Sequence, residues 1–294
     1  MILPILGGPT GSGKTALTQI LDPNRFEIIS FDSRQVYWDL PVGTTSPTTE
    51  EKNYIRHHLV GFLSAGESPN ANQFSILAKE AMEDIRNRGK IPFIVCGTGF
   101  YLRAFLLGMF PVPFVPESTK RYVLDLPLEE ASQILKEKDP MASESLSPKD
   151  GYRIRRALEV VLTGILWSEV SKSQVGGYLA QNPDLRVVGH WINHPRPELY
   201  ARINERVSAI AEGMLIECKR VLEIYGADCP GLRSLGYNFA LDFLNGRIDR
   251  NTFLDRLAQS HRNYAKRQIT WFKKDPILSA ISYADAVKVF KNIK

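Results

Sequence analysis

The sequence predicts an α/β fold in which a parallel sheet is flanked by helices and carries a small helical insertion. Short runs of consecutive apolar residues alternate with stretches of helical periodicity, as is typical of strands covered on both faces. A glycine-rich loop joins the first apolar run to the first helical pattern. Further along, a proline-rich segment introduces a stretch with only helical periodicity, which predicts the insertion.

The elements of the sheet layer follow from these two periodicities. We expect strands at Ile2–Leu6, Phe26–Phe31, Pro92–Cys96, Arg186–Ile192 and Leu278–Tyr283. We expect the covering helices at Lys14–Leu21, Ala71–Arg88, Pro197–Tyr225, Asn238–Leu244 and Asn251–Lys273. The segment MFPVPFVPES separates the two parts, because proline-rich stretches mark loops. Residues 1–116 and 186–294 are therefore predicted to form the core domain, and residues 117–185 the helical insertion.

The composition excludes several classes of protein. Of the 294 residues, 44% are hydrophobic and 23% are charged, which is ordinary for a globular chain. The three cysteines form no C-x-x-C pair, so neither a disulfide framework nor a zinc knuckle is expected. We see no signal peptide and no membrane span, and we expect a cytoplasmic protein. The net charge of +5 leans only slightly toward polyanionic partners.

The segment GPTGSGKT, Gly8–Thr15, matches the complete pattern G-x-x-x-x-G-K-[ST] of a phosphate-binding loop. Its strand–loop–helix setting indicates a P-loop NTPase-like core. The glycines let backbone N–H groups turn toward phosphate oxygens, and the helix N-terminus adds a favourable dipole. Lys14 is expected to reach a terminal phosphate, and Thr15 to bind Mg²⁺. The loop alone does not identify the compound that carries the phosphates.

Asp32 follows directly after a predicted strand, at the sheet edge where open α/β folds bind ligands. A carboxylate there can accept a proton from a nucleophile, but it can equally cap the next turn. Ser33, Arg34 and Gln35 add donors suited to a base edge or a sugar. The strand ending at Cys96 carries no acid, although an ATPase needs one to hold its metal and water. This favours transfer to another nucleophile over hydrolysis.

Together these motifs resemble the tRNA dimethylallyltransferases, also called tRNA isopentenyltransferases. The resemblance rests on GPTGSGKT, ISFDSRQVY followed by GTTSPT, HHL, CGTGFYL, SPKDGYRIRRALEV, RINERVSAIAEGM, RSLGYN and YAKRQITWF, in the family's order. It covers the chain from Gly7 to about Phe272. No zinc-finger motif follows YAKRQITWF, so the bacterial type of the family is implied.

The resemblance implies an activity and the roles of several residues. The loop, with its residues Gly8, Pro9, Thr10, Gly11, Ser12, Gly13, Lys14 and Thr15, would bind the diphosphate of dimethylallyl diphosphate. The acceptor would be N6 of the adenosine immediately 3′ of the anticodon, with Asp32 as the general base. Lys14, Thr15, Arg202 and Mg²⁺ would stabilise the departing diphosphate. The partner would be the anticodon stem-loop of tRNA, bound by a monomer with no membrane attachment.

A second set of residues is expected to contact the tRNA. They are Asp32, Ser33, Arg34, Gln35, Thr98, Tyr152, Arg153, Ile154, Arg155, Arg156, Arg233, Arg262, Lys266 and Arg267. Basic side chains interleaved with aromatic ones suit phosphate contacts and stacking. Some members of such a set can instead be solvated surface or core, and Trp271 is expected to be structural.

Three other functions account for part of the pattern. A kinase or another P-loop phosphotransferase explains the loop but leaves the basic C-terminal helix unexplained. A noncatalytic RNA-binding protein with a relic loop explains the basic helices alone. A prenyltransferase acting on free adenine nucleotides explains the site, whereas the basic helices and the insertion favour a polymeric acceptor.

Overall fold

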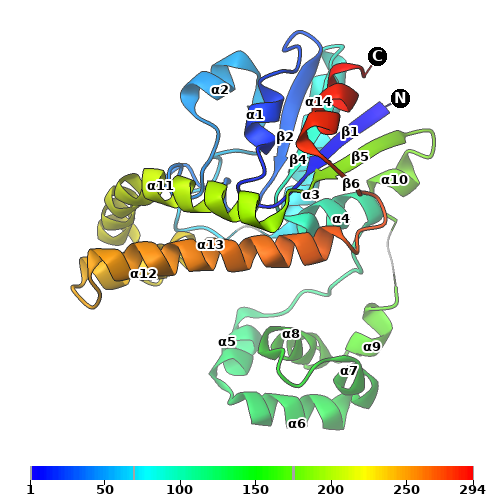
Figure 1. Ribbon diagram of the computed structural model, residues 1–294. Helices are drawn as coiled ribbons and strands as arrows, with labels where there is room; N and C mark the ends of the chain where they lie inside the picture. The colour runs from blue at the N-terminus through cyan, green and yellow to red at the C-terminus, as the bar shows by residue number, and fades with distance from the viewer. Residues whose placement is uncertain (1, 69, 174–175, 294) are drawn as a thin grey trace. The chain divides into compact units, whose positions relative to one another are not determined.

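The computed structural model describes residues 2–68, 70–173 and 176–293, and the chain divides into two compact units (Figure 1). Met1–Leu106 and Asn182–Lys294 form the first, here called the core unit. Leu107–Gln181 form the second, the helical unit. The contacts thus divide the chain at the start of the proline-rich segment, whereas the sequence-based boundary was placed at its end.

The core unit is built on a six-stranded sheet with the order β3-β2-β4-β1-β5-β6, in which every pair of neighbours is parallel. Its strands are β1 (Ile2–Gly7), β2 (Phe26–Phe31), β3 (His57–His58), β4 (Ile91–Cys96), β5 (Arg186–Ile192) and β6 (Ser279–Ile281). All five predicted strands are present, and the two-residue β3 was not predicted. The predicted α/β class with a parallel sheet is confirmed.

Helices cover both faces of this sheet, as the apolar strands require. The helices of the core unit are α1 (Lys14–Thr18), α2 (Thr49–Tyr54), α3 (Ala71–Asn87), α4 (Gly99–Leu107), α11 (Arg196–Tyr225), α12 (Tyr237–Leu244), α13 (Arg250–Phe272) and α14 (Tyr283–Lys291), with the 3₁₀ turn η1 (Pro230–Arg233). On one face, α1 and α14 join strand residues such as Phe93 in a single apolar cluster that includes Leu17 and Phe290. On the other, Phe31 packs against Phe74 of α3.

Three helices differ from the prediction: α1 is shorter than expected, and α2 and α14 were not predicted. The helix α1 ends at Thr18, three residues short of the predicted Leu21, because the next residues form tighter turns in which Ile20 and Leu21 donate to carbonyls three residues back. The helix α14 was not predicted. Its N-terminus is capped by the Ser282 side chain, which accepts a hydrogen bond from the N–H of Asp285.

The helical unit contains α5 (Glu117–Asp125), α6 (Leu128–Lys138), α7 (Pro140–Ser145), α8 (Gly151–Val161), α9 (Trp167–Val170) and α10 (Tyr178–Gln181). Its core gathers Val123, Leu135, Leu158 and other apolar side chains. Asp139 is 2% exposed, and its carboxylate accepts hydrogen bonds from the N–H groups of Ala142 and Ser168. This buried carboxylate therefore joins the start of α7 to α9. The predicted helical character of this segment is confirmed.

Near the start of β2, at the opposite end from Asp32, Glu27 forms a buried ion cluster. The carboxylate accepts hydrogen bonds from Arg88 at 2.7 Å and from His58 at 2.7 Å, and Lys90 lies 3.3 Å away. Burial by itself raises the pKa of Glu27, but the bonds from Arg88, His58 and Lys90 outweigh it and lower the pKa to about 2. The ionised carboxylate is therefore part of the folded state.

We expect Glu27→Gln to destabilise the core unit by about 3 kcal/mol at neutral pH, which is the free energy that corresponds to this pKa difference. Since the pKa is lower in the folded than in the unfolded state, the contribution is complete above about pH 4.5 and is lost as the pH falls toward about 2. Thermal melting should show a lower melting temperature for Glu27→Gln than for the unchanged protein at pH 7, and this difference should disappear in acid. Glu80→Gln, on an exposed position of α3, is the matched control. A difference in melting temperature that stays the same across this pH range would contradict the prediction.

Within the described residues, no helix is both long and apolar enough to cross a membrane.

Candidate active site

The phosphate-binding loop leaves β1 at Gly7 and enters α1 at Lys14, so the predicted strand–loop–helix setting is present. Gly11 and Gly13 have φ angles of 77° and 91°, a left-handed conformation that favours glycine. Lys14 folds back over the loop, and its ammonium group donates to the carbonyls of Gly8 at 2.8 Å and Pro9 at 3.1 Å. The lysine is thereby held at the centre of the loop.

Residues far along the chain hold this loop in place. Gln268 of α13 accepts from the N–H of Thr10 at 2.8 Å and donates to the carbonyl of Gly97 at 2.8 Å. Arg202 of α11 donates to the carbonyl of Gly11 at 2.8 Å. His194, just before α11, lies with its Nε2 3.0 Å from the carbonyl oxygen of Ser12. The loop conformation is thus fixed by tertiary contacts as well as by its glycines.

Burial lowers the pKa of Lys14 to about 8, the neighbouring Asp32 carboxylate opposes that shift, and the charge of Arg206 adds to it. The ammonium is still mostly protonated at neutral pH. In the described part of the chain it has no carboxylate within salt-bridge distance, and its hydrogen-bond partners there are the two carbonyls. A buried cation of this kind is suited to an incoming anion.

Asp32 lies where the ends of two neighbouring strands meet. Gly97 and Thr98, after β4, both donate from their N–H groups to the carbonyl of Phe31, the last residue of β2. A Cβ atom at Gly97 would stand 2.5 Å from Oδ2 of Asp32, so a side chain there would displace the carboxylate. Ser33 donates its N–H to Oγ1 of Thr98 at 3.1 Å. Asp32 and Thr98, expected in one site, are therefore brought together.

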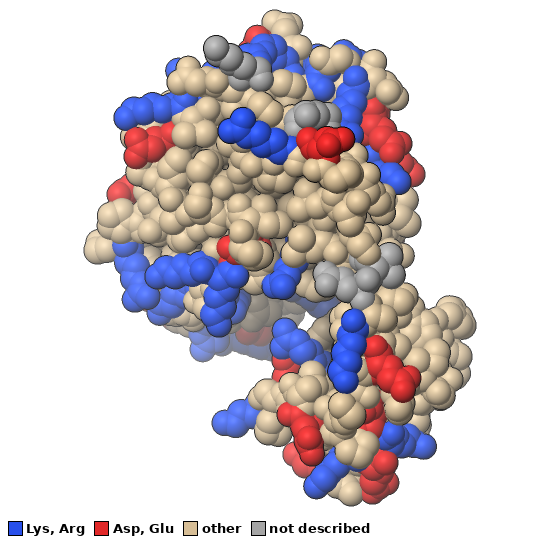
Figure 2. Space-filling view, turned by 90° about the vertical axis from the view of Figure 1, so that its right-hand side faces the viewer, with Lys and Arg blue, Asp and Glu red and all other residues tan. Residues whose placement is uncertain are grey.

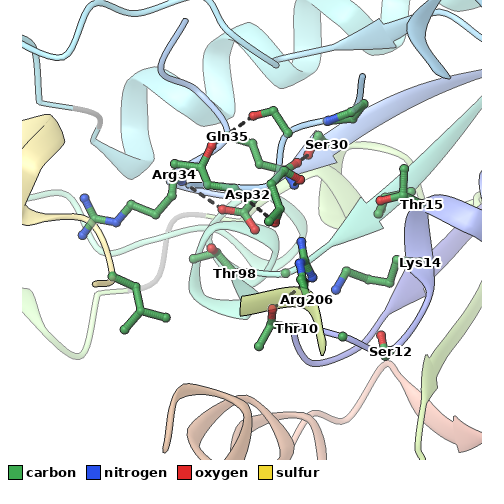
Figure 3. A pocket seen from close by; sticks show the side chains of 18 of the residues that line it. Thr10, Ser12, Lys14, Thr15, Ser30, Asp32, Arg34, Gln35, Thr98 and Arg206 are labelled. Carbon is green, nitrogen blue, oxygen red and sulfur yellow. Dashed lines mark hydrogen bonds between the residues drawn. The ribbon is translucent and has the colours of Figure 1, made fainter. Parts of the chain in front are cut away.

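The Asp32 carboxylate has one oxygen engaged and one available. Its Oδ1 accepts the N–H of Arg34 at 2.9 Å, which is the local turn that the capping interpretation of the sequence describes. The side chain also lines the cleft (Figure 3). The same carboxylate can therefore shape its turn and face a ligand, so the two sequence interpretations do not exclude each other.

One cleft of about 1040 Å³ in the core unit collects most of the predicted site (Figure 3). Of the predicted residues, it is lined by Thr10, Gly11, Ser12, Gly13, Lys14, Thr15, Asp32, Ser33, Arg34, Gln35, Thr98, Arg202, Arg233 and Arg267. Gly8, Pro9, Arg262 and Lys266 are not among its lining residues. The phosphate loop and the Asp32 turn face each other across this cleft, because β1 and β2 both adjoin β4 and end at the same edge of the sheet.

Gln35 is not a free recognition group in this structure. Its amide donates to the carbonyl of Thr45 at 2.9 Å and accepts from the hydroxyl of Ser30 at 3.0 Å. It therefore connects the strand β2 to the loop that carries the sequence GTTSPT. Trp271 lies against Gly99, where a Cβ atom would come within 2.1 Å of its ring. The structural role expected for this tryptophan agrees with that packing.

The predicted contacts on α8 belong to the helical unit and divide by exposure. Tyr152 is 80% exposed, and Arg153 pairs with Asp150 on the surface. Ile154 is 2% exposed and belongs to the apolar core, so its side chain is not available to an RNA and its assignment is corrected. Arg155 donates to the carbonyl of Leu126 at 3.0 Å and thus also serves the fold of this unit.

The sequence analysis gave no role to Arg206 or Gln268, and it included His261 and Tyr264 only among the aromatic residues interleaved with basic ones. All four line the cleft. Arg206 follows Arg202 by four residues, a helical spacing that places both on one side of α11. Gln268 of α13 has no such signal in the sequence, because a single glutamine at helical spacing is not distinguished from its neighbours. Arg267 lies over the ring of Tyr264, with its guanidinium carbon 5.5 Å from the ring centroid.

The donor set of the cleft fits a magnesium ion that arrives with phosphate. The described residues contain no group of three His, Cys, Asp or Glu side chains that could hold a metal alone. The Thr15 hydroxyl lines the cleft with no hydrogen-bond partner in the described structure. A hydroxyl can supply one ligand, and phosphate oxygens and water supply the others that Mg²⁺ prefers.

The strand next to the phosphate loop also distinguishes this site from the site of an ATPase. β4 pairs directly with β1 and ends at Cys96, which is fully buried, followed by Gly97. Burial raises the pKa of the Cys96 thiol, so it stays protonated. In the described structure this strand therefore ends without an acid, and the Asp32 carboxylate at the end of β2 lines the cleft opposite the loop.

The fold and the cleft together define a P-loop-type α/β protein with a carboxylate opposite its phosphate loop. A family model described as IPP transferase matches residues 35–275. The chain belongs to this IPP transferase family.

Three curated relatives share one name, and each aligns with nearly the full length of this chain. The tRNA dimethylallyltransferase of Leptospira biflexa is 70% identical over 100% of this chain and 99% of the relative. That of Leptospira interrogans is 47% identical over 99% of this chain and 98% of the relative. The enzyme of the same name from Thermotoga maritima is 34% identical over 100% of this chain and 97% of the relative.

Solved structures agree in fold. The tRNA isopentenylpyrophosphate transferase of Bacillus halodurans matches with a TM-score of 0.68 and 28% identity, over 99% of this chain and 94% of that one. A eukaryotic dimethylallyltransferase described as acting on tRNA matches with a TM-score of 0.78 and 25% identity, over 97% of this chain and 75% of that one.

Proposed function

We propose that this protein transfers a dimethylallyl group from dimethylallyl diphosphate to N6 of the adenosine immediately 3′ of the anticodon in tRNA, releasing diphosphate. The observation that carries the proposal is the position of Asp32 opposite the phosphate loop in one cleft. The relatives of 70% and 47% identity support it, since both are tRNA dimethylallyltransferases. The protein is proposed to act as a monomer in the cytoplasm, on tRNA.

The donor's diphosphate is assigned to the loop Gly8–Thr15. Backbone N–H groups of the loop and the ammonium of Lys14 would bind its oxygens, and Arg202 would approach from α11. These hydrogen-bonding groups are in position before the reaction. They therefore stabilise the negative charge that develops on the diphosphate as the carbon–oxygen bond of dimethylallyl diphosphate breaks. Mg²⁺, held by Thr15 and the phosphates, would neutralise part of that charge.

The acceptor amine is assigned to the Asp32 side of the cleft. As the N6–carbon bond forms, the nitrogen becomes positive and must lose a proton, which the Asp32 carboxylate can accept. The new carbon–nitrogen bond replaces the carbon–oxygen bond, and the electron pair leaves with the diphosphate. Thr98, Ser33 and Arg34 line the same side and are available to position the adenosine. The acceptor base must leave its stack to enter, which costs least in a loop.

The tRNA is assigned to basic side chains that line the cleft or lie on the surface outside it. Between Arg256 and Lys274 the sequence has six Lys or Arg residues and no acid. Figure 2 shows Lys and Arg side chains gathered along one border of the larger unit. Arg233, Arg262, Lys266 and Arg267 are proposed phosphate contacts in the core unit, and Tyr152, Arg153 and Arg156 in the helical unit.

The proposal is tested by incubating the protein with unmodified tRNA, dimethylallyl diphosphate and Mg²⁺, followed by mass spectrometry of the tRNA nucleosides. We expect one adenosine per acceptor tRNA to gain a dimethylallyl group. Parallel reactions with ATP and with free adenosine monophosphate as acceptor test the alternatives. Phosphoryl transfer from ATP, or prenylation of the free nucleotide at a rate equal to that of tRNA, would contradict the proposal.

A further inference from the structure

Arg206 is a cation for which the described residues provide no anionic partner. It lies on α11, one helical turn after Arg202, and its side chain points into the space between Asp32, Lys14 and Thr98 (Figure 3). Its guanidinium donates a hydrogen bond to the Thr10 hydroxyl at 3.2 Å. No carboxylate of the described chain lies within 4.0 Å of its guanidinium. A guanidinium offers five donors, so most of its capacity is unused.

Burial lowers the pKa of Arg206, and the Asp32 carboxylate only partly opposes that effect. The guanidinium nevertheless stays charged, because its ordinary pKa lies far above neutral. Desolvating a charge is costly unless an opposite charge or several hydrogen bonds compensate. The structure around Arg206 therefore lacks the compensation that a bound anion would supply.

The same wall of the cleft contains a second polar group without partners. His261 of α13 is 4% exposed, and neither of its ring nitrogens has a hydrogen-bond partner in the described residues. Burial, together with a smaller effect of the nearby charge of Arg206, lowers its pKa to about 4. The imidazole is thus neutral at physiological pH, with one N–H donor and one lone pair, and both are unsatisfied. An unsatisfied buried polar group costs about 1–3 kcal/mol.

These two groups complement each other. The positive charge of the Arg206 guanidinium disfavours a second proton on the nearby His261 ring, so the ring keeps a single N–H donor. The ring N–H of His261 and the guanidinium N–H groups not bonded to Thr10 are hydrogen-bond donors beside a positive charge, and the described residues place no carboxylate in a hydrogen bond or ion pair with them. Such a set matches the oxygens of a phosphate group.

We propose that Arg206 and His261 form a phosphate-contacting subsite of the cleft, separate from the contacts made by Lys14, Thr15 and Arg202. The phosphate belongs to the donor's diphosphate or to the RNA backbone next to the acceptor nucleotide. Binding would give both side chains the partners that they lack. The inference rests on the proposed function, because both phosphates are those of its substrates.

The test measures binding, so that it does not depend on turnover. Isothermal titration of inorganic diphosphate in the presence of Mg²⁺ is compared for the unchanged protein, Arg206→Gln, His261→Phe and His261→Gln. Fluorescence anisotropy of a labelled anticodon stem-loop RNA is measured on the same proteins at several salt concentrations. Lys219→Gln is the matched control, since it removes an exposed cation from the same helix α11. Thermal melting shows that each variant is folded.

If the phosphate is the donor's, Arg206→Gln should weaken diphosphate binding about tenfold or more and His261→Phe about threefold or more. His261→Gln, which keeps an N–H donor, should restore most of the affinity. If it is the RNA's, the same ranking should appear with the stem-loop, with a salt slope lower by about one. If Arg206→Gln does not fold, the same binding measurements are made with Arg206→Lys and the two His261 variants.

Diphosphate and RNA affinities within twofold of the unchanged protein for the folded Arg206 and His261 variants would overturn the subsite. That result would leave the proposed function standing, because prenyl transfer by the unchanged protein is measured independently. Absence of prenyl transfer by the unchanged protein, together with the expected loss of binding, would instead contradict the proposed function and retain the phosphate subsite.

Discussion

Asp32→Asn should lower kcat for dimethylallyl transfer to tRNA by about 10³–10⁴-fold, while the affinity for tRNA stays within about twofold. The amide has the shape of the carboxylate, and its oxygen can still accept the N–H of Arg34 that holds the turn. It cannot take a proton from the acceptor amine. The loss should therefore fall on the chemical step and leave binding intact.

Single-turnover kinetics with saturating tRNA and donor measure that step, and filter binding measures the affinity. Asp228→Asn, which makes the same substitution at an exposed position of the core unit, should behave like the unchanged protein. If Asp32→Asn retained more than about a tenth of the rate, the carboxylate would be a cap for its turn and not the base.

Lys14→Met should weaken binding of diphosphate by about 10–100-fold at neutral pH, since it removes a charged donor at the centre of the phosphate loop. A second effect distinguishes this lysine from other cations. Its pKa is lowered to about 8 by burial, so the ammonium begins to lose its proton just above neutral pH. Bound diphosphate favours the charged form, and affinity must fall as the pH rises through about 8.

The expected slope is an additional loss of up to about tenfold in affinity per pH unit above this pKa, relative to Lys14→Met. Isothermal titration at several values from about pH 7 to about pH 9.5 measures it. Diphosphate changes its own protonation in this range, but it does so equally for both proteins, and the ratio of affinities removes that effect. A constant ratio would show that the Lys14 ammonium does not titrate in this range.

The periodicity of the sequence was sufficient for most of the fold because each strand and helix is locally consistent. The run Arg186–Ile192 is apolar enough to be recognised as a buried strand, and β5 has those bounds. The two-residue β3 was missed because two histidines carry no strand signal, and they pair with β2 only through the tertiary structure. The helix α1 was predicted too long because apolar residues continue beyond Thr18 into tight turns.

Some residues of the candidate site could likewise be predicted from the sequence, and others could not. Lys14, Thr15 and Asp32 were identified because each is local to a motif or to the end of a strand. Arg206 and Gln268 were not, because their importance comes from contacts with Thr10, which lies about 200 residues or more away along the chain. Ile154 was wrongly included because a motif match names every residue of a segment, whereas a helix buries one side of it.

The sequence by itself therefore determined the class of fold, the phosphate loop, the acid at the end of β2 and the family, because these depend on residues close together in the chain. The tertiary structure alone decided that Asp32 faces the loop across one cleft and that Gln268 ties the loop to Gly97. It also decided that, within the described residues, Arg206 bonds to the Thr10 hydroxyl but has no anionic partner, and that the ring nitrogens of His261 are buried without a hydrogen-bond partner. Burial and pairing are properties of elements brought together by folding, and no local pattern of residues encodes them.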